Sequence, residues 1–297
     1  MHYQQFIETI HKHLEGLFGP EINTSIHSTL KNNGKERIGI TISHKDTNIS
    51  PTIYLEEFYE QYCHDRPFDD IVKNIVSLYH DVKFSQSWDM EQVQDYQRAR
   101  SYIVFKLIHR EKNTSLLKDI PFIPYLDLAI VFYILLETTE KGTATILINN
   151  DLLHYWNISL SDIYSAAKTN TPLLMSADFK PMRTIIHELL GKPCTEKDLE
   201  ENRMYVLSNQ FRQFGAACIL YHRVLEDIGN QLNEDFYILP SSIHEVIILP
   251  ACFSPNEEDL NEMIVDINET QVSDEEVLSD HAYYYSRKTN KLVSVGQ

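Results

Sequence analysis

Leu128-Ala129-Ile130-Val131-Phe132-Tyr133-Ile134-Leu135-Leu136-Glu137 is the stretch of sequence that decides the fold. Nine of its ten residues are apolar, and half of the ten are β-branched or aromatic. Such a run is typical of a strand that is buried on both faces of a sheet. Glu140-Lys141-Gly142 and a second β-rich run, 143–148, follow it. We therefore expect a hairpin whose first strand is central in its sheet.

Upstream of this strand, the apolar residues change from helical to strand spacing. From Tyr3 to Leu17 they recur every three or four residues, which predicts an amphipathic N-terminal helix. Asn33-Gly34 separates two alternating runs, 22–30 and 38–42, and predicts a hairpin because both residues tolerate positive φ. Further helices are expected at 54–62 and 71–79, and a further strand at 102–109.

Downstream, helices and short strands alternate. Helices are expected at 160–167, 181–190, 224–232 and 254–267, and strands at 204–208, 215–220, 236–239, 246–249 and 291–295. Ser159 and Asp162 resemble a capping box, Ser254-Pro255 is expected to begin the last long helix, and Ser273 to Glu276 repeats the capping pattern.

Hairpins alternating with helices favour an α+β fold over a doubly wound sheet. We expect antiparallel or mixed sheets built from hairpins, with amphipathic helices packed on them. Two units are expected: an N-terminal helix-hairpin-helix unit at 1–84 and a main α+β domain at 100–297, joined by a weak helix or linker. The alternative is one continuous unit.

The charge balance narrows the classes of partner. The net charge is −17, from 26 basic and 43 acidic residues, so we expect neither nucleic acid nor an anionic membrane as a partner. The longest apolar stretch, 126–136, is too short to span a membrane, and the N-terminus lacks the pattern of a signal peptide. We therefore expect a cytoplasmic protein.

Motifs for cofactors and metals are missing from the sequence. Its nine scattered glycines form neither a phosphate-binding loop nor a dinucleotide fingerprint. His187-Glu188 and His244-Glu245 lack a second ligand one helical turn later, so neither predicts a zinc site. No two cysteines lie within ten residues of each other, which favours reduced structural thiols. We expect no cofactor and no metal.

The first candidate site is the segment from Tyr237 to Val246. It places Ser241, Ser242, His244 and Glu245 between two apolar strands, where a turn could orient the imidazole as a general base. The alternative is structural: the two serines cap a turn, and His244 and Glu245 lie at a strand edge.

A second candidate site follows the second strand of the central hairpin. It contains Asn149, Asp151, His154 and Trp156, polar and aromatic groups at the end of an apolar strand. The alternative is that Asp151 only caps a helix.

A third candidate is acidic. Between Ser254 and Asp280 the chain has ten acidic residues and no Lys or Arg. This region is either a solvated helix face or a docking face for a basic protein or a mimic of nucleic-acid charge.

Four strings resemble a known family. They are Pro51-Thr52-Ile53-Tyr54-Leu55-Glu56, Asp127-Leu128-Ala129-Ile130-Val131-Phe132-Tyr133, Ile238-Leu239-Pro240-Ser241-Ser242-Ile243-His244-Glu245-Val246-Ile247 and Val277-Leu278-Ser279-Asp280. The resemblance is to domain of unknown function family 5688, a bacterial family, and covers nearly the whole chain. It implies a single family-length unit in a bacterial cytosol, sometimes beside mobile-element genes, and it implies no activity or catalytic residue.

Two functional hypotheses follow. The first is a protein-interaction or binding module that uses the acidic region 254–280; the absence of a reaction-class motif and the 17 tyrosines favour it. The second is a hydrolase that uses His244 with Ser241, Ser242 or Glu245. The sequence leaves the oligomeric state open.

Overall fold

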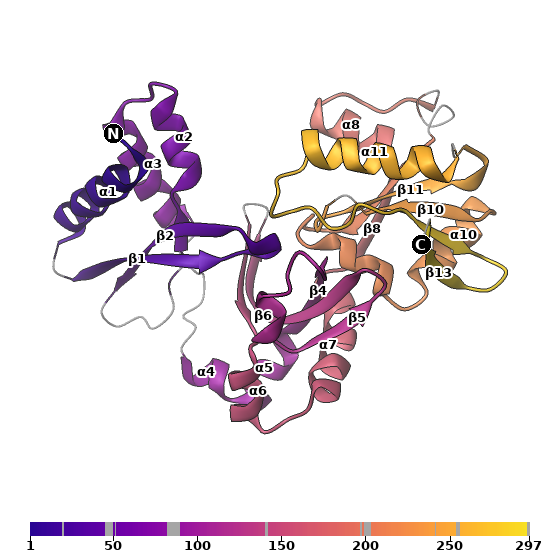
Figure 1. The fold of residues 1–297 in the computed structure, drawn as a ribbon, viewed down its shortest axis with the longest axis horizontal. Coiled ribbons are helices and arrows are strands. Elements are labelled where there is room, and N and C mark those ends of the chain that lie inside the picture. Colours follow the sequence, from indigo (N-terminus) through magenta and orange to yellow (C-terminus); the bar gives the residue numbers. More distant parts are fainter. Residues whose placement is uncertain are drawn as a thin grey trace. The chain divides into compact units, whose positions relative to one another are not determined.

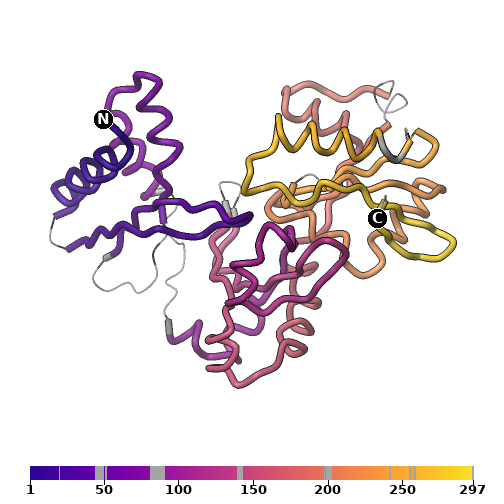
Figure 2. The backbone as a smooth tube through the Cα atoms, in the orientation of Figure 1, coloured from indigo at the N-terminus to yellow at the C-terminus, as the bar shows by residue number. Residues whose placement is uncertain are grey.

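The computed structural model describes residues 1–19, 21–44, 50, 52–81, 90–139, 142–196, 198, 203–240, 242–253 and 256–295. The chain divides into two compact units, residues 1–99 and 100–297 (Figures 1 and 2). The strands within the described ranges form three antiparallel sheets, with helices packed on them. The predicted α+β class is therefore confirmed.

The N-terminal unit is built on a three-stranded sheet with the order β1-β2-β3. Its elements are α1 (Tyr3–Phe18), β1 (Ile22–Leu30), β2 (Glu36–His44), β3 (Thr52–Tyr54), α2 (Glu56–Cys63), α3 (Phe68–Asp81), α4 (Met90–Gln94) and α5 (Tyr96–Ala99). Apolar residues of α1, α2, α3 and the sheet form one core. The hairpin prediction is confirmed: Asn33 and Gly34 have φ of 58° and 70°, a conformation that these two residue types tolerate best.

The deciding stretch forms β6 (Leu128–Thr139), the central strand of a four-stranded sheet. One edge of β6 pairs with β4 (Ile103–His109), and the other pairs with β5 (Phe122–Tyr125) and β7 (Gly142–Leu147). Helix α6 (Asn150–Trp156) follows β7, and α7 (Leu160–Leu174) packs against β4 and β6. Residues 128–136 are all buried, so the prediction of a strand covered on both faces is confirmed.

The second sheet of this unit has six strands in the order β13-β12-β10-β11-β9-β8. The strands are β8 (Ala177–Pro181), β9 (Tyr205–Asn209), β10 (Phe236–Leu239), β11 (Val246–Pro250), β12 (Tyr283–Ser286) and β13 (Lys291–Ser294). The helices are α8 (Met182–Leu189), α10 (Val224–Leu232) and α11 (Glu257–Thr270). Leu260 and Ile264 of α11 share a core with Leu239 of β10 and Leu249 of β11, which fixes α11 along the sheet (Figure 1).

Two local predictions were wrong. The expected strand at 215–220 is a buried 3₁₀ helix, because a short run that is apolar on every side has no period to distinguish the two. Helix α11 begins at Glu257, and its cap is Asn256, whose side chain accepts a hydrogen bond from the Asp259 amide. The residues from Ser273 to Glu276, which repeat the capping pattern, form a turn. Ser254 and Pro255 lie outside the described residues.

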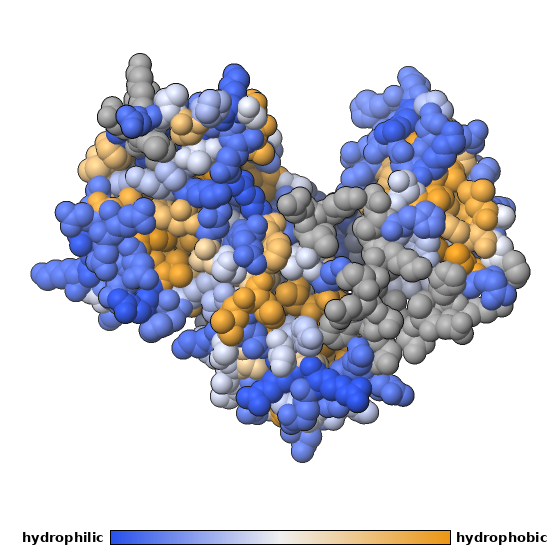
Figure 3. All heavy atoms as spheres, turned by 180° about the vertical axis from the view of Figure 1, so that it is seen from behind, coloured by the Kyte–Doolittle hydropathy of each residue, from blue (hydrophilic) through white to orange (hydrophobic). Residues whose placement is uncertain are grey.

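The helices and one face of the surface were compared with what a membrane-spanning protein requires. Across the described parts of the chain, no helix combines the length and the apolar character needed to cross a bilayer. Figure 3 shows one face, on which hydrophilic residues predominate and apolar residues form small patches. Patches of this kind are ordinary on protein surfaces.

Candidate functional site

The first candidate segment forms the connection between β10 and β11. Ser242 lies there in an isolated antiparallel bridge with Val277, and its Oγ accepts a hydrogen bond of 3.1 Å from the backbone amide of His244. This is the turn geometry that serine side chains favour. Ser241 lies outside the described residues. The contact between Ser242 and His244 therefore involves the histidine backbone and not its ring.

Both ring nitrogens of His244 have other partners. Nδ1 accepts a hydrogen bond of 3.3 Å from the Phe214 amide, and Nε2 lies 3.3 Å from Oε1 of Glu276. The ring also stacks on Phe214, with centroids 5.6 Å apart. Because Nδ1 accepts, the neutral ring carries its proton on Nε2 and has no lone pair free to take a proton from a hydroxyl. The hydrolase hypothesis stays a prediction without support from this geometry.

The backbone at Gly215 lies very close to the backbone of His244, and this contact explains the position of the His244 ring. Ser208 Oγ donates a hydrogen bond of 2.7 Å to the carbonyl of His244. A Cβ at Gly215 would lie 2.6 Å from that same carbonyl oxygen and would collide with Ser208 Oγ. Only glycine fits at this position, and its neighbour Phe214 supplies the amide and the ring that hold His244.

The second candidate segment forms the start of α6. Asn149 is its N-cap, and its side chain accepts a hydrogen bond of 2.8 Å from the Leu152 amide. The cap is thus Asn149 rather than Asp151, which is exposed in the first turn. Trp156 is buried, and His154 is exposed on the last turn. These contacts are what a helix terminus needs, so the binding role of this segment stays a prediction.

Three of the strings that carry the family resemblance meet in the C-terminal unit. The buried carboxylate of Asp127 accepts hydrogen bonds of 2.6 Å from both Ser279 Oγ and Tyr283 OH. The Ser279 amide donates to the carbonyl of Pro240, which belongs to a third string. Burial, followed by the nearby charge of Asp127, raises the pKa of Tyr283 well above its ordinary value. This network ties the four-stranded sheet to the six-stranded sheet, and it was not predictable from the sequence.

A second group of polar residues surrounds this network. Asp280 receives hydrogen bonds from Lys112 at 3.1 Å and from Asn268 at 2.9 Å, and these outweigh the effect of burial to lower the pKa of Asp280. His109 is buried, and its Nδ1 accepts a hydrogen bond of 3.2 Å from the Lys112 amide. Burial and the Lys112 charge lower the pKa of His109. The arrangement therefore favours the neutral form of His109 and the ionised form of Asp280.

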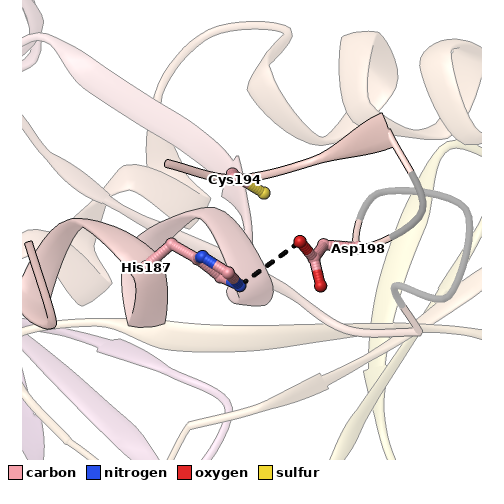
Figure 4. Close-up of side chains that lie close together, drawn as sticks. All are labelled: His187, Cys194 and Asp198. Atoms are coloured by element: carbon pink, nitrogen blue, oxygen red, sulfur yellow. Dashed lines mark ion pairs between the residues drawn. The ribbon is translucent and has the colours of Figure 1, made fainter. Parts of the chain in front are cut away.

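A cluster of potential metal ligands lies after α8. His187 is in the last turn of α8, and Cys194 and Asp198 come from the segment that follows (Figure 4). One ligand atom from each side chain lies within 4.8 Å of the other two, and all three residues are partly buried. Hydrogen bonds from the Thr195 hydroxyl and amide, together with the nearby charge of Arg183, lower the pKa of Asp198.

This cluster was not predicted from the sequence, because no second ligand follows His187 one helical turn later. The ligands here are spaced by seven residues and then by four, and a chain reversal after α8 brings them together. Gly191, with φ of 62°, forms that reversal. The spacing of His187, Cys194 and Asp198 around a glycine after a helix was the available signal.

Half of the acidic region 254–280 lies in helix α11 (Glu257–Thr270). Leu260, Ile264 and Asn268 form its buried side. The opposite side carries Asp259, Glu262, Asp266 and Glu269, all exposed. Spacings of three, four and three residues place these four carboxylates on one face.

The two units define an α+β protein whose C-terminal unit joins a four-stranded and a six-stranded antiparallel sheet through the Asp127 network. The chain belongs to the family of unknown function DUF5688, whose model matches residues 3–287 and so extends over both units. The expected resemblance is confirmed. No curated protein and no solved structure matches the chain.

Proposed function

We propose that the protein is a protein-interaction module that binds a basic partner through the acidic face of α11, made by Asp259, Glu262, Asp266 and Glu269. The observation that carries this proposal is the row of four exposed carboxylates on one helix face. Within the described part of the chain, no Lys, Arg or His side chain forms an ion pair with any of the four.

The row of four carboxylates does not help α11 to fold, because repulsion between neighbouring carboxylates destabilises the helix. Glu262 and Asp266 are a like-charge pair at i,i+4, and each has another acidic neighbour three residues away. Three such pairs cost roughly 1 kcal/mol together at low salt. Asp266 and Glu269 also lie toward the negative end of the helix dipole. A basic partner would remove both penalties, so a binding role accounts for charges that the free protein tolerates at a cost.

The chemistry of the partner follows from the sign of the charge. A net charge of −17 disfavours phosphate backbones and anionic membranes, which leaves a basic protein surface as the complementary class. The proposal also includes the setting that the family resemblance implies: a bacterial cytoplasm, sometimes with mobile-element genes nearby.

The proposal is tested by capture from a lysate of the native host, with two variants that each lose four negative charges. One replaces Asp259, Glu262, Asp266 and Glu269 by Asn or Gln. The control replaces four exposed acidic residues elsewhere, Glu21, Glu60, Asp69 and Glu111. We expect a basic protein to be retained by the native chain and by the control, lost by the α11 variant, and released as salt screens the charges. Equal retention by both variants would refute the proposal.

A further inference from the structure

We propose that His187, Cys194 and Asp198 form a binding site for a zinc-class divalent metal ion. The three ligand atoms come from one short segment of the C-terminal unit, between the last turn of α8 and residue 198. The side chains face one another across the turn that follows the helix (Figure 4). This site is independent of the acidic face of α11.

The hydrogen bonding of His187 prepares its ring for a metal. Nδ1 lies 3.0 Å from the carbonyl oxygen of Pro193, which can only accept a hydrogen bond, so Nδ1 carries the proton. In the neutral ring, Nε2 then presents a lone pair toward the carboxylate of Asp198. Metal-binding histidines commonly donate their other ring N–H to a backbone carbonyl in this way. Either a metal ion or a second proton, on Nε2, could join this nitrogen to the carboxylate.

The distance between the two groups favours a metal ion over a proton. Nε2 of His187 and Oδ2 of Asp198 are 3.5 Å apart, whereas a charge-assisted N–H···O hydrogen bond is about 2.7–2.9 Å long. Zinc ligands lie about 2.0–2.2 Å from the ion, so two of them in a tetrahedral shell are about 3.3–3.5 Å apart. The observed separation matches the edge of such a tetrahedron.

Cys194 supplies the third ligand. Its Sγ is within 4.8 Å of the other two ligand atoms, and it accepts a hydrogen bond of 3.9 Å from Thr184 Oγ1. In a tetrahedral shell the sulfur would lie about 3.6 Å from the nitrogen, which a small side-chain rotation can achieve. Thr195 supports the carboxylate from outside, since its hydroxyl donates a hydrogen bond of 2.6 Å to Oδ2 of Asp198.

The ligand types identify the metal class. A set of one nitrogen, one sulfur and one oxygen suits zinc or cobalt, while magnesium and calcium prefer oxygen ligands alone. Three protein ligands leave one tetrahedral position for water or an external ligand. The competing group is Arg183, whose Nη1 lies 3.6 Å from Oδ1 of Asp198. This guanidinium must move aside when a divalent ion binds.

The test is a Co²⁺ titration of the chelator-treated full-length protein, followed by absorbance, with Zn²⁺ competition. We expect stoichiometric binding and a thiolate-to-cobalt charge-transfer band. Cys194→Ser should abolish the band and weaken binding roughly tenfold or more, a loss at least as large as that expected for a supporting residue. The matched controls Cys63→Ser and Cys252→Ser change exposed cysteines elsewhere and should keep both. Absence of stoichiometric binding, or a band that survives Cys194→Ser, would overturn the proposal.

The Arg183→Ala variant is expected to gain Co²⁺ affinity, a result that unfolding of the variant cannot produce. It removes the cation that competes for Asp198 and should therefore tighten Co²⁺ binding. Unchanged or weaker binding would show that Asp198 is not a ligand. His187→Gln, with its far-ultraviolet circular dichroism unchanged, should lose binding, and normal affinity in this variant would contradict the proposal.

Discussion

At the scale of single residues, local chemistry was predictable and distant partners were not. Asn33-Gly34 predicted its turn, and Ser159 forms the expected capping box with Asp162. The partners of His244 were not predictable, because the Phe214 amide is thirty residues away in sequence and reaches the ring only through tertiary packing.

Gly215→Ala should destabilise the C-terminal unit by roughly 1–3 kcal/mol, the usual range for an atom inserted into a packed interior. The new methyl group would lie 2.6 Å from the His244 carbonyl oxygen and the Asn209 amide nitrogen, and neither backbone can move freely. Urea unfolding measures the change. As a control, Gly16→Ala should stabilise α1 by up to about 1 kcal/mol, because a Cβ there meets nothing within 4 Å. An unchanged midpoint for Gly215→Ala would refute the close approach.

At the scale of elements, apolar periodicity identified α1 and α8, and an unbroken apolar run rich in β-branched and aromatic residues identified β6. It failed for the 3₁₀ helix at 215–220, where Gly, Ala, Ala and Cys are small and all buried. Short strands such as β5, with four residues, carry too little pattern to be recognised.

The Glu262→Gln, Asp266→Asn, Glu269→Gln variant of α11 should be more stable than the native chain by roughly 1 kcal/mol at low salt. The reason is relief of like-charge repulsion and of unfavourable charge near the helix C-terminus. Thermal unfolding at low and high salt measures it. The gain should vanish at high salt, since screening removes the repulsion in the native chain as well. A gain that persists would point to helix propensity instead of charge.

At the scale of the whole molecule, the C-terminal unit depends on polar contacts between residues far apart in sequence. Asp127 lies beside β6, while Ser279 and Tyr283 are 152 and 156 residues later. No local pattern could pair them, although Asp127 was visible as a charge beside an apolar run. The comparable convergence of His187, Cys194 and Asp198 depends on the reversal at Gly191.

The free energy of unfolding should fall in two steps as the solution is acidified. The pKa of His109 in the folded chain lies below its ordinary 6.5. Below about pH 6.5 His109 therefore binds a proton in the unfolded chain before it does so in the folded chain, and stability falls. The folded pKa of Asp280 lies below 3.8, so stability is lost again on acidification below that value. Urea titrations across pH measure both steps. His109→Gln should remove the first step and leave the second, and an unchanged slope just below pH 6.5 would contradict this assignment.

The sequence by itself determined most of the longer helices and strands, the α+β class and the family, because these depend on periodicity, capping and turn chemistry between neighbouring residues. Only the tertiary structure decided which polar groups meet: His244 with Glu276, Asp127 with Ser279, and His187 with Asp198. The physical reason is that a hydrogen bond or a metal ligand set depends on positions in space within a few tenths of an ångström. Packing of distant elements sets those positions, and a one-dimensional pattern does not contain them.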